Sequence, residues 1–318
     1  MLLATAGGLP LRNLAMTHPS RIVVTGGTGF VGRAVCAKLA LNYPQCEIVV
    51  PTRRRADSRR ATWPTQVRFK EADIHDAATQ QDLLTRADVL IHLVAVLHGS
   101  AQVFKRVHAD LPQSLARACA DQSVGRVVHV SALGVAADAP SQYLRSKHAG
   151  EQAWLESGLW TTLLRPSVIF GAEDQLTNLF VQIQRFLPVL PLAAADALFQ
   201  PVWVDDVAAA IVLATAGAPP IVECAGPQVM SLRELVRHAG AMAGCQRPVI
   251  GLPDMLARLQ AGLMSLLPGP TLMSADNLLS MRVPSVATGK LPGLRELGID
   301  PAGLTRLQAH FAPMRRSR

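Results

Sequence analysis

Six short runs rich in valine and isoleucine recur along the first half of the chain, and they limit the folds that it can adopt. The runs are apolar at successive positions instead of alternating, which is typical of strands buried on both faces of a sheet. Helical stretches separate them, so we predict an α/β fold with a doubly wound parallel sheet. The predicted strands are residues 21–25, 47–51, 67–70, 89–94, 126–130 and 161–165.

A glycine-rich loop, TGGTGFVG at residues 25–32, follows the first predicted strand and opens a predicted helix. In this pattern Gly26 permits a tight turn, Gly29 lets the backbone approach a pyrophosphate, and Gly32 allows close packing of helix on strand. The helix N-terminus offers amides and a partial positive charge to the anion. The loop therefore predicts dinucleotide binding to a Rossmann-like sheet. The loop residues expected to contact the cofactor are Gly26, Thr28, Gly29, Phe30, Val31 and Gly32.

The residues after the second predicted strand indicate which dinucleotide is bound. An acidic residue there would hold a ribose 2′-hydroxyl, whereas an arginine suits a 2′-phosphate. The chain has PTRRR and no acid at this point, so Arg53 and Arg54 predict NADP(H), with NAD(H) less favoured. Further candidates placed from the fold are Asp73 and Ile74 beside the adenine, and Val94 and Ala95 against the ribose.

A serine, a tyrosine and a lysine form the predicted proton-transfer group. Ser131 follows the fifth predicted strand directly, and Tyr143 and Lys147 lie one turn apart on one helix face. A tyrosine can pass a proton to a substrate oxygen, although a free phenol with a pKa of about 10 is a poor base. A neighbouring ammonium stabilises the phenolate and can hold the nicotinamide ribose, and a serine hydroxyl can orient the same oxygen. The group predicts either hydride-transfer chemistry or a cofactor cradle alone.

Helices are predicted between the strands and again in the second half of the chain. The predicted ranges are 30–41, 103–122, 141–156, 204–215 and 231–244, the last opening on a capping box of Ser231 and Glu234. Beyond about residue 219, strand-like runs give way to short, apolar, proline-interrupted helices. We expect a loose extension (1–19), an NAD(P)-binding Rossmann domain (20–218) and a smaller, mostly helical C-terminal lobe (219–318) for substrate or partner.

Composition excludes several classes of function. The net charge of +8 comes largely from five arginines within residues 53–60 and three at the C-terminal tail, and aromatic residues are only 4%. Nucleic-acid binders spread basic residues along a face with aromatics between them, so no nucleic-acid partner is predicted. Compact basic clusters better suit a phosphate or a membrane surface.

Cysteine and histidine usage indicates the compartment. The five cysteines are scattered without a CxxC pair, and the nine histidines form no HExxH, so no disulfide framework or metal site is predicted. The longest charge-free runs, 207–222 and 259–275, are shorter than the ~20 residues that span a bilayer. We expect a cytoplasmic location, with a peripheral position at the inner face of the membrane left open.

The combination of TGxxGxxG and YxxxK resembles the short-chain dehydrogenase/reductase superfamily, in its extended or atypical, NAD-dependent epimerase/dehydratase-like branch. The phrases HVSALGV, YLRSKHAGE, LLRPSVIFGAEDQLTNLF and QPVWVDDVAAAI are similar to those of a group around the nucleotide-binding accessory subunit of respiratory complex I and its bacterial relatives. The resemblance implies that Pro166 and Val168 flank the nicotinamide. His108 stands where many active members carry an asparagine, and it either relays protons or supports a contact between helix and sheet.

Two functions from different classes stay open. The first is an NADP(H)-dependent oxidoreductase that moves hydride to or from a carbonyl or alcohol of an apolar, quinone- or isoprenoid-like small molecule, with epimerisation as a subsidiary possibility. The apolar stretch 253–273 is either core or a pocket or interfacial patch for such a substrate. The second is a non-catalytic, NADPH-binding structural or assembly protein in contact with a membrane or a membrane complex.

Overall fold

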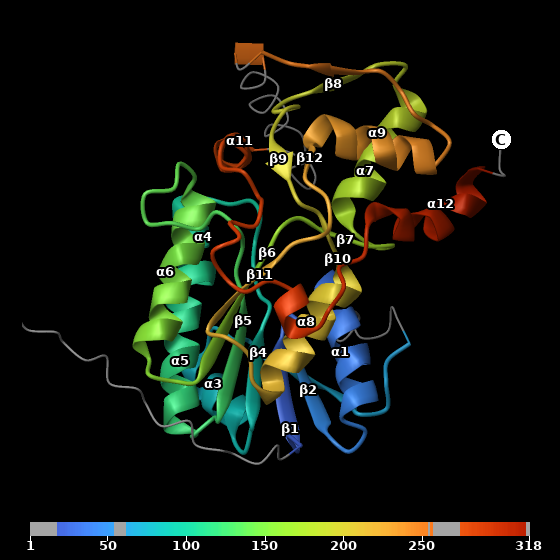
Figure 1. Ribbon diagram of the computed structural model, residues 1–318. Helices are drawn as coiled ribbons and strands as arrows, with labels where there is room; N and C mark the ends of the chain where they lie inside the picture. Colours follow the sequence, from blue (N-terminus) through green and yellow to red (C-terminus); the bar gives the residue numbers. More distant parts are fainter. Residues whose placement is uncertain (1–17, 54–61, 254, 257–273, 316–318) are drawn as a thin grey trace, which may run out of the picture.

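The computed structural model describes residues 18–53, 62–253, 255–256 and 274–315. Its centre is a parallel sheet of seven strands in the order β11-β6-β5-β4-β1-β2-β3 (Figure 1). The order reverses between β1 and β4, as in a doubly wound Rossmann-like fold, and the predicted fold class is confirmed. The strands are β1 (Arg21–Thr25), β2 (Glu47–Thr52), β3 (Val67–Glu71), β4 (Val89–His92), β5 (Arg126–Val130), β6 (Thr161–Pro166) and β11 (Ile221–Cys224).

Helices cover both faces of the sheet because every central strand is apolar at successive positions. Ile22 and Val24 of β1 face one core cluster together with α1 (Phe30–Asn42) and α8 (Val204–Ala216). Val23 faces the opposite cluster, which is covered by α3 (Ala77–Leu84), α5 (Leu111–Asp121) and α6 (Gln142–Glu156). The alternation of one strand between two buried faces explains the continuous apolar runs in the sequence.

A second core lies beyond the carboxyl ends of the strands (Figure 1). Its helices are α7 (Gln175–Phe186), α9 (Leu232–Met242) and α12 (Gln308–Arg315). Short strand pairs join it: β7 (Ile169–Phe170) with β10 (Val202–Trp203), β9 (Leu198–Phe199) with β12 (Met230–Ser231), and β8 (Leu190–Leu192) with β13 (Val249–Gly251). The capping box of Ser231 and Glu234 at the start of α9 is confirmed.

The chain passes between the sheet and the second core more than once. α7, β8 and β9 precede residue 218 but belong to the second core, whereas β11 follows it and completes the sheet. The predicted division at residues 218 and 219 does not follow this layout, because sequential order and spatial grouping differ here. Of the predicted extension 1–19 and the apolar stretch 253–273, residues 1–17, 254 and 257–273 lie outside the described residues.

The predicted helix 103–122 is interrupted in the structure. It consists of α4 (Ala101–Lys105), a π-helical turn (Arg106–Asp110) and α5. Pro112 explains this interruption, because it has no N–H to donate to the carbonyl of His108 four residues earlier. That carbonyl faces α6, where a Cβ atom on Gly150 would lie 2.0 Å from its oxygen. Glycine at this position therefore lets the two helical segments pack closely.

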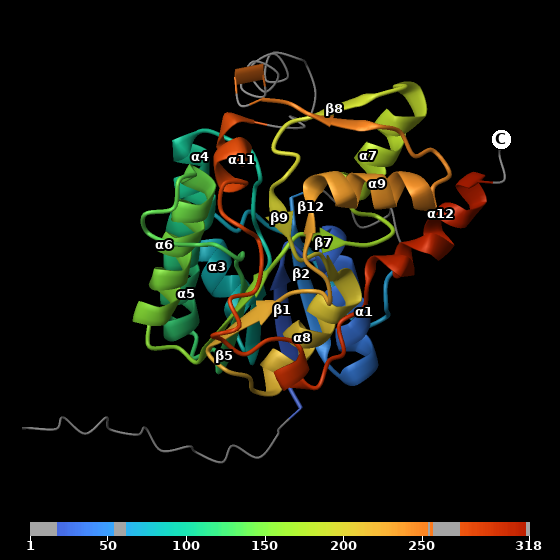
Figure 2. The same ribbon diagram turned by 45° about the horizontal axis from the view of Figure 1, so that its top comes forward.

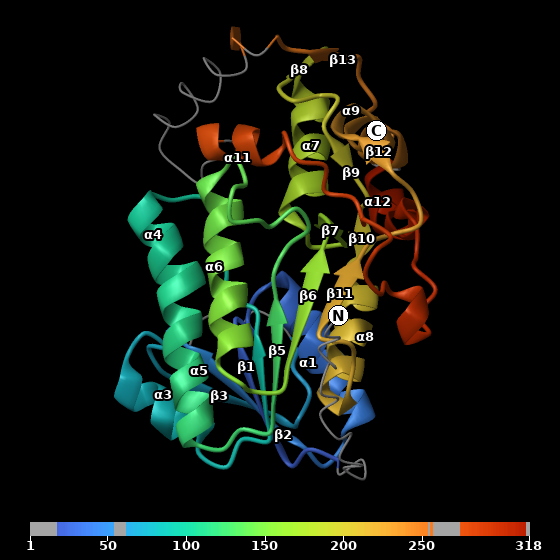
Figure 3. The ribbon, with the colours of Figure 1, turned by 60° about the vertical axis from the view of Figure 1, so that its left-hand side comes forward.

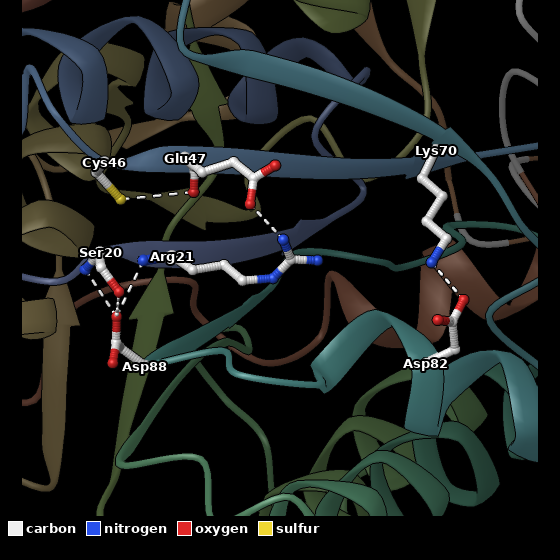
Figure 4. Close-up of polar contacts among 7 residues, drawn as sticks. All are labelled: Ser20, Arg21, Cys46, Glu47, Lys70, Asp82 and Asp88. Carbon is white, nitrogen blue, oxygen red and sulfur yellow. Dashed lines mark hydrogen bonds and ion pairs between the residues drawn. The ribbon is translucent and has the colours of Figure 1, made fainter.

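Polar contacts join the strands at the edge of the sheet opposite the second core (Figure 4). Asp88, just before β4, accepts hydrogen bonds from the backbone N–H and Oγ of Ser20 at 2.7 Å and from the N–H of Arg21 at 2.9 Å. Arg21 forms an ion pair with Glu47 at the start of β2. These contacts align the amino ends of three strands and leave the carboxyl edge to the functional site. No helix in the described part of the chain is both long and apolar enough to cross a bilayer.

Candidate functional site

The glycine-rich loop forms a tight turn at the carboxyl end of β1. Gly26 has a φ of +77°, and a Cβ atom there would lie 3.2 Å from the carbonyl carbon of Leu93 and the nitrogen of Val94, after β4. At Gly32 a Cβ atom would lie 2.4 Å from the Gly26 carbonyl oxygen. α1 begins after Gly29 without a side-chain cap, so its first amides point to where an anion would bind. This cradle fits the pyrophosphate of a dinucleotide.

The predicted loop residues lie together at this cradle. Thr28, Phe30 and Val31 belong to the turn and the first turn of α1, next to Gly29, whose N–H donates to the Gly26 carbonyl at 3.0 Å. The ring of Phe30 approaches Gly171 after β7, where a Cβ atom would lie 2.8 Å from Cζ. The loop is therefore held from the side of the second core as well as from the sheet.

The predicted adenosine-binding residues meet at the ends of β2 and β3. The strands are in parallel register with Thr52 opposite Glu71, so Arg53 and the Ala72–Asp73 turn leave the sheet side by side. Asp73 accepts a hydrogen bond from the N–H of His75 at 3.0 Å, and the carbonyl of Ile74 accepts from the side chain of Gln80 at 2.8 Å. Arg53 is exposed, and Arg54 lies outside the described residues.

Ser131 and Lys147 come together at the carboxyl end of β5. Lys147 is buried, with 1% of its surface exposed, and its Nζ donates to the carbonyl of Val130 at 2.7 Å. The Oγ of Ser131, the next residue, is buried and has no hydrogen-bond partner among the described residues. An orphaned buried hydroxyl of this kind fits a site that is completed by a ligand. Tyr143 lies one turn before Lys147 on α6, which begins at a Ser141 cap.

Burial shifts the pKa values of the pair on α6 in opposite directions. Desolvation lowers the pKa of Lys147 to about 8, although the carboxylate of Glu151 one turn further on opposes this shift. Desolvation raises the pKa of Tyr143 to about 12. The phenol is therefore neutral at physiological pH, and it can donate a proton much more readily than it can accept one.

His108 serves as a connector in the structure. The N–H of Val96 donates to its Nε2 at 3.0 Å, so Nδ1 carries the proton that faces Ser146 Oγ at 2.9 Å. Ser146 in turn donates to the carbonyl of Tyr143 at 2.8 Å. Burial, and then the charge of Lys147, lower the pKa of His108 to about 3, so the ring is neutral. Both ring nitrogens are used to hold the loop after β4 against α6.

Comparison with known proteins identifies the family. Residues 22–222 match the model of the NAD dependent epimerase/dehydratase family, which is more than half of the chain. This chain belongs to that family. The predicted membership of the short-chain dehydrogenase/reductase superfamily is confirmed, and the family's NAD(P) cofactor agrees with the cradle around Gly26.

Two proteins similar to this chain have names that denote different functions. The chain is 28% identical, over 92% of its length and 77% of the relative's, to subunit 9 of the alpha subcomplex of mitochondrial NADH dehydrogenase [ubiquinone] from Arabidopsis thaliana. It is also 28% identical to ceramide reductase of Caulobacter vibrioides, over 73% of this chain and 74% of that one.

A solved structure has the same fold. The dTDP-glucose 4,6-dehydratase DesIV of Streptomyces venezuelae, with NAD and TYD bound, aligns with a TM-score of 0.70 and 25% identity. The alignment covers 94% of this chain and 97% of DesIV.

The contacts of α11 with the amino end of α6 and with the loop after β4 were not indicated by the motifs. Asp276, in the segment around α11 (Ala275–Ser280), accepts hydrogen bonds from the N–H groups of Gln142 at 2.7 Å and Tyr143 at 3.0 Å. Asn277 donates to the carbonyl of Leu97 after β4 at 3.3 Å. Figures 2 and 3 show α11 beside the amino end of α6. The capping signal of Ser274 with Asn277 predicts a short helix but not its contact 133 residues away.

A buried ion pair fixes α6 on the sheet. Glu151 is fully buried and accepts two hydrogen bonds from Arg165 of β6, at 2.9 Å from Nε and 2.5 Å from Nη2. In the register of β6 and β11, Arg165 is opposite Glu223, which is also buried. Because Glu151 lies one turn after Lys147, the pair sets the height of the lysine above β5.

Pro166 and Val168 occupy the connection from β6 to the second core. The carbonyl of Pro166 accepts a hydrogen bond from the N–H of Leu133 at 3.0 Å, and that of Val168 accepts from Val202 at 3.0 Å. The first contact joins this connection to the loop after Ser131. Their predicted position beside the nicotinamide stays a prediction.

Proposed function

We propose that the chain is an NADP(H)-dependent oxidoreductase that acts on a carbonyl or alcohol group of an apolar small molecule of quinone or isoprenoid type. The observation that carries this proposal is the buried ammonium of Lys147 on the Val130 carbonyl, beside the partnerless hydroxyl of Ser131 and one turn from Tyr143. NADP(H), when bound, would supply or accept the hydride. Arg53 would contact its 2′-phosphate, and the Gly26 turn its pyrophosphate.

Tyr143 rests in the protonation state from which a reduction starts. With its pKa raised to about 12, Tyr143 is protonated at neutral pH and can donate to a substrate oxygen that gains charge. The reverse reaction starts from the phenolate, which is also what the donation produces, so burial raises the cost of this species in both directions. Ser131 would orient the same oxygen through its hydroxyl, and Lys147 would hold the cofactor ribose and stabilise charge near Tyr143.

An apolar substrate agrees with the surface of the second core. Ile250 (57%), Met255 (79%) and Leu256 (45%) are strongly exposed near the start of the predicted apolar stretch 253–273. Exposed neighbouring apolar side chains of this kind commonly mark a binding surface. The similarity to ceramide reductase, whose name denotes action on a lipid, supports the same substrate class. We propose a peripheral position at a membrane surface for the protein.

A second function is favoured by a different observation. His108 directs both of its ring nitrogens to protein partners, namely the Val96 N–H and the Ser146 hydroxyl. A site satisfied in this way can hold NADPH tightly without turnover. The similarity to subunits of mitochondrial NADH dehydrogenase supports this alternative, a structural or assembly protein that contacts a membrane complex.

One experiment separates the two functions. The protein is purified without added nucleotide, its small-molecule content is identified by mass spectrometry, and NADPH oxidation is then followed with a soluble quinone and with a long-chain ketone. We expect NADPH to exchange and to be oxidised, with a rate that Tyr143→Phe lowers about 100-fold while NADPH affinity stays unchanged. NADPH that survives dialysis and resists every acceptor would instead support the structural function.

A further inference from the structure

A cavity of about 230 Å³ lies next to the connection that follows β3. It is lined by His75, Gln80, Arg106, Asp110, Leu111 and Ser114. His75 lies in the connection from β3 to α3, and Arg106 opens the π-helical turn. The cavity therefore lies between the β3–α3 connection and the π-helical turn. Neither element belongs to the glycine-rich loop or to the end of β2.

Positive charge gathers at this cavity. Burial lowers the pKa of His75, and the charges of Arg106 and Arg53 lower it further, while Asp73 acts in the opposite sense. Two arginines on different elements thus act on one imidazole, although β2 and the π-helical turn are about 50 residues apart in the sequence. An anion bound near this imidazole would be attracted by both guanidinium groups.

The acidic side chains around the cavity are already engaged. Asp110 forms an ion pair with Lys105 at 2.6 Å, Asp73 accepts from the N–H of His75, and Asp76 caps α3 through Thr79. Within the described ranges, no carboxylate pairs with Arg106. The guanidinium is exposed at the rim and keeps its donors for a ligand.

The π-helical turn gives Arg106 a fixed base. Pro112 removes one helical hydrogen bond, and the His108 carbonyl packs against Gly150 of α6. His108 also binds Val96 and Ser146 through its ring. An element held at both its backbone and a side chain two residues from Arg106 can present that arginine reproducibly.

We propose that Arg106 and His75, which line this cavity, form a second wall of the 2′-phosphate site, in addition to Arg53 at the end of β2. The inference rests on the proposed use of NADP(H). It assigns the preference for NADP(H) over NAD(H) to the π-helical turn and the β3–α3 connection together with the end of β2. The ligand class is the adenosine 2′-phosphate group, which an arginine can bind through paired N–H donors.

The test compares Arg106→Leu with wild type for NADPH, NADH and adenosine 2′,5′-bisphosphate, by calorimetric titration of the full chain. We expect Arg106→Leu to weaken NADPH and the bisphosphate about tenfold and to leave NADH within about twofold. His75→Gln should shift the same two ligands by a smaller factor. Arg117→Leu, an exposed arginine on α5, is the matched control and should change none of the three affinities.

The outcomes distinguish failure of the proposed function from failure of this inference alone. If wild type binds neither coenzyme, the proposed function fails and this inference fails with it. If wild type binds both but Arg106→Leu changes them equally or not at all, nucleotide binding stands and the second wall is wrong. Retained NADH affinity in the variants shows that they are folded, so a selective loss of NADPH cannot come from unfolding.

Discussion

The two ends of the candidate site along the carboxyl edge of the sheet are built from different parts of the polypeptide. At the phosphate-loop end, consecutive backbone atoms of residues 25–32 make the site, and side chains must be absent at Gly26 and Gly32. At the proton-transfer end, side chains make the site: buried Ser131 follows β5, and buried Lys147 and half-buried Tyr143 lie on α6, whose first turn is held by the α11 segment. A backbone site is encoded locally, whereas a side-chain site depends on which distant segments the fold brings together.

The ends also differ in their effect on stability. The glycines let α1 pack closely on β1, so the cradle and the fold gain from the same contacts. Lys147 instead keeps an ammonium in the interior, where burial and its charge also lower the pKa values of His92 and His108 to about 3. Uncompensated burial of charge destabilises a fold, and it is tolerated mainly where function needs it.

The largest expected effect is at the backbone end, from Gly32→Ala. The new Cβ atom would lie 2.4 Å from the Gly26 oxygen and 2.5 Å from the Gly27 Cα, both backbone atoms, so the loop must change shape. We expect NADPH affinity to fall about 100-fold, equivalent to about 3 kcal/mol, in a fluorescence titration. Gly125→Ala, whose Cβ would meet only the Asp88 oxygen at 3.4 Å, is the control. Equal affinity of both variants would contradict the local account of this end.

The next effect tests how α6 is held at the side-chain end. Glu151→Gln leaves the half-buried guanidinium of Arg165 facing a neutral amide, and breaking a buried pair costs about 3 kcal/mol. Urea unfolding should show this loss in free energy. Glu156→Gln, at the exposed end of the same helix, should change it by less than about 0.5 kcal/mol. A similar loss in both variants would mean that the pair does not brace the helix.

The contrast between the ends explains what the sequence could predict. The glycine spacing, the strand before it and the helix after it lie within a dozen residues, and the structure has all of them where the pattern indicates. The same holds for Ser231 with Glu234. Periodicity missed β11, because IVEC is short and follows two prolines. It missed the π-helical turn, because apolar residues continue at helical spacing on both sides of Pro112.

The contacts of Asp276 and Arg165 could not be predicted for a different reason. Their partners, Tyr143 and Glu151, are set by tertiary packing. The two pairs are separated by 133 and 14 residues, and no local signal in the chain marks either pair. His108 shows the intermediate case. Its position on the helix before β5 was evident from the sequence, but only the neighbours Val96 and Ser146 decide that it connects elements.

A third effect has the opposite sign and sharpens the contrast in stability. Lys147→Met removes an ammonium whose pKa falls from 10.5 unfolded to about 8 folded, so it should stabilise the fold by about 2 kcal/mol at pH 7, allowing for the lost hydrogen bond. Between pH 8 and 10.5 the unfolded wild-type chain binds more protons than the folded one, so wild-type stability rises and the gain shrinks. Urea unfolding across this range measures it, with the exposed Lys290→Met as control. A gain that is independent of pH would show that packing, not charge, is responsible.

The smallest effect concerns the distant partner of the side-chain end. Asp276→Ala removes the acceptor of the Gln142 and Tyr143 amides, and loss of such a cap costs about 1 kcal/mol. Because Ser141 still caps α6 through Leu144, the helix should persist while its first turn opens more often. Hydrogen exchange should therefore accelerate at Tyr143, and NADPH affinity should stay within about twofold because the phosphate loop is untouched. Ser274→Ala, which removes the cap of α11 alone, separates loosening of α11 from loss of its contact with α6. If Ser274→Ala accelerates exchange at Tyr143 as much as Asp276→Ala does, the position of α11 as a whole, and not the Asp276 carboxylate, orders this turn.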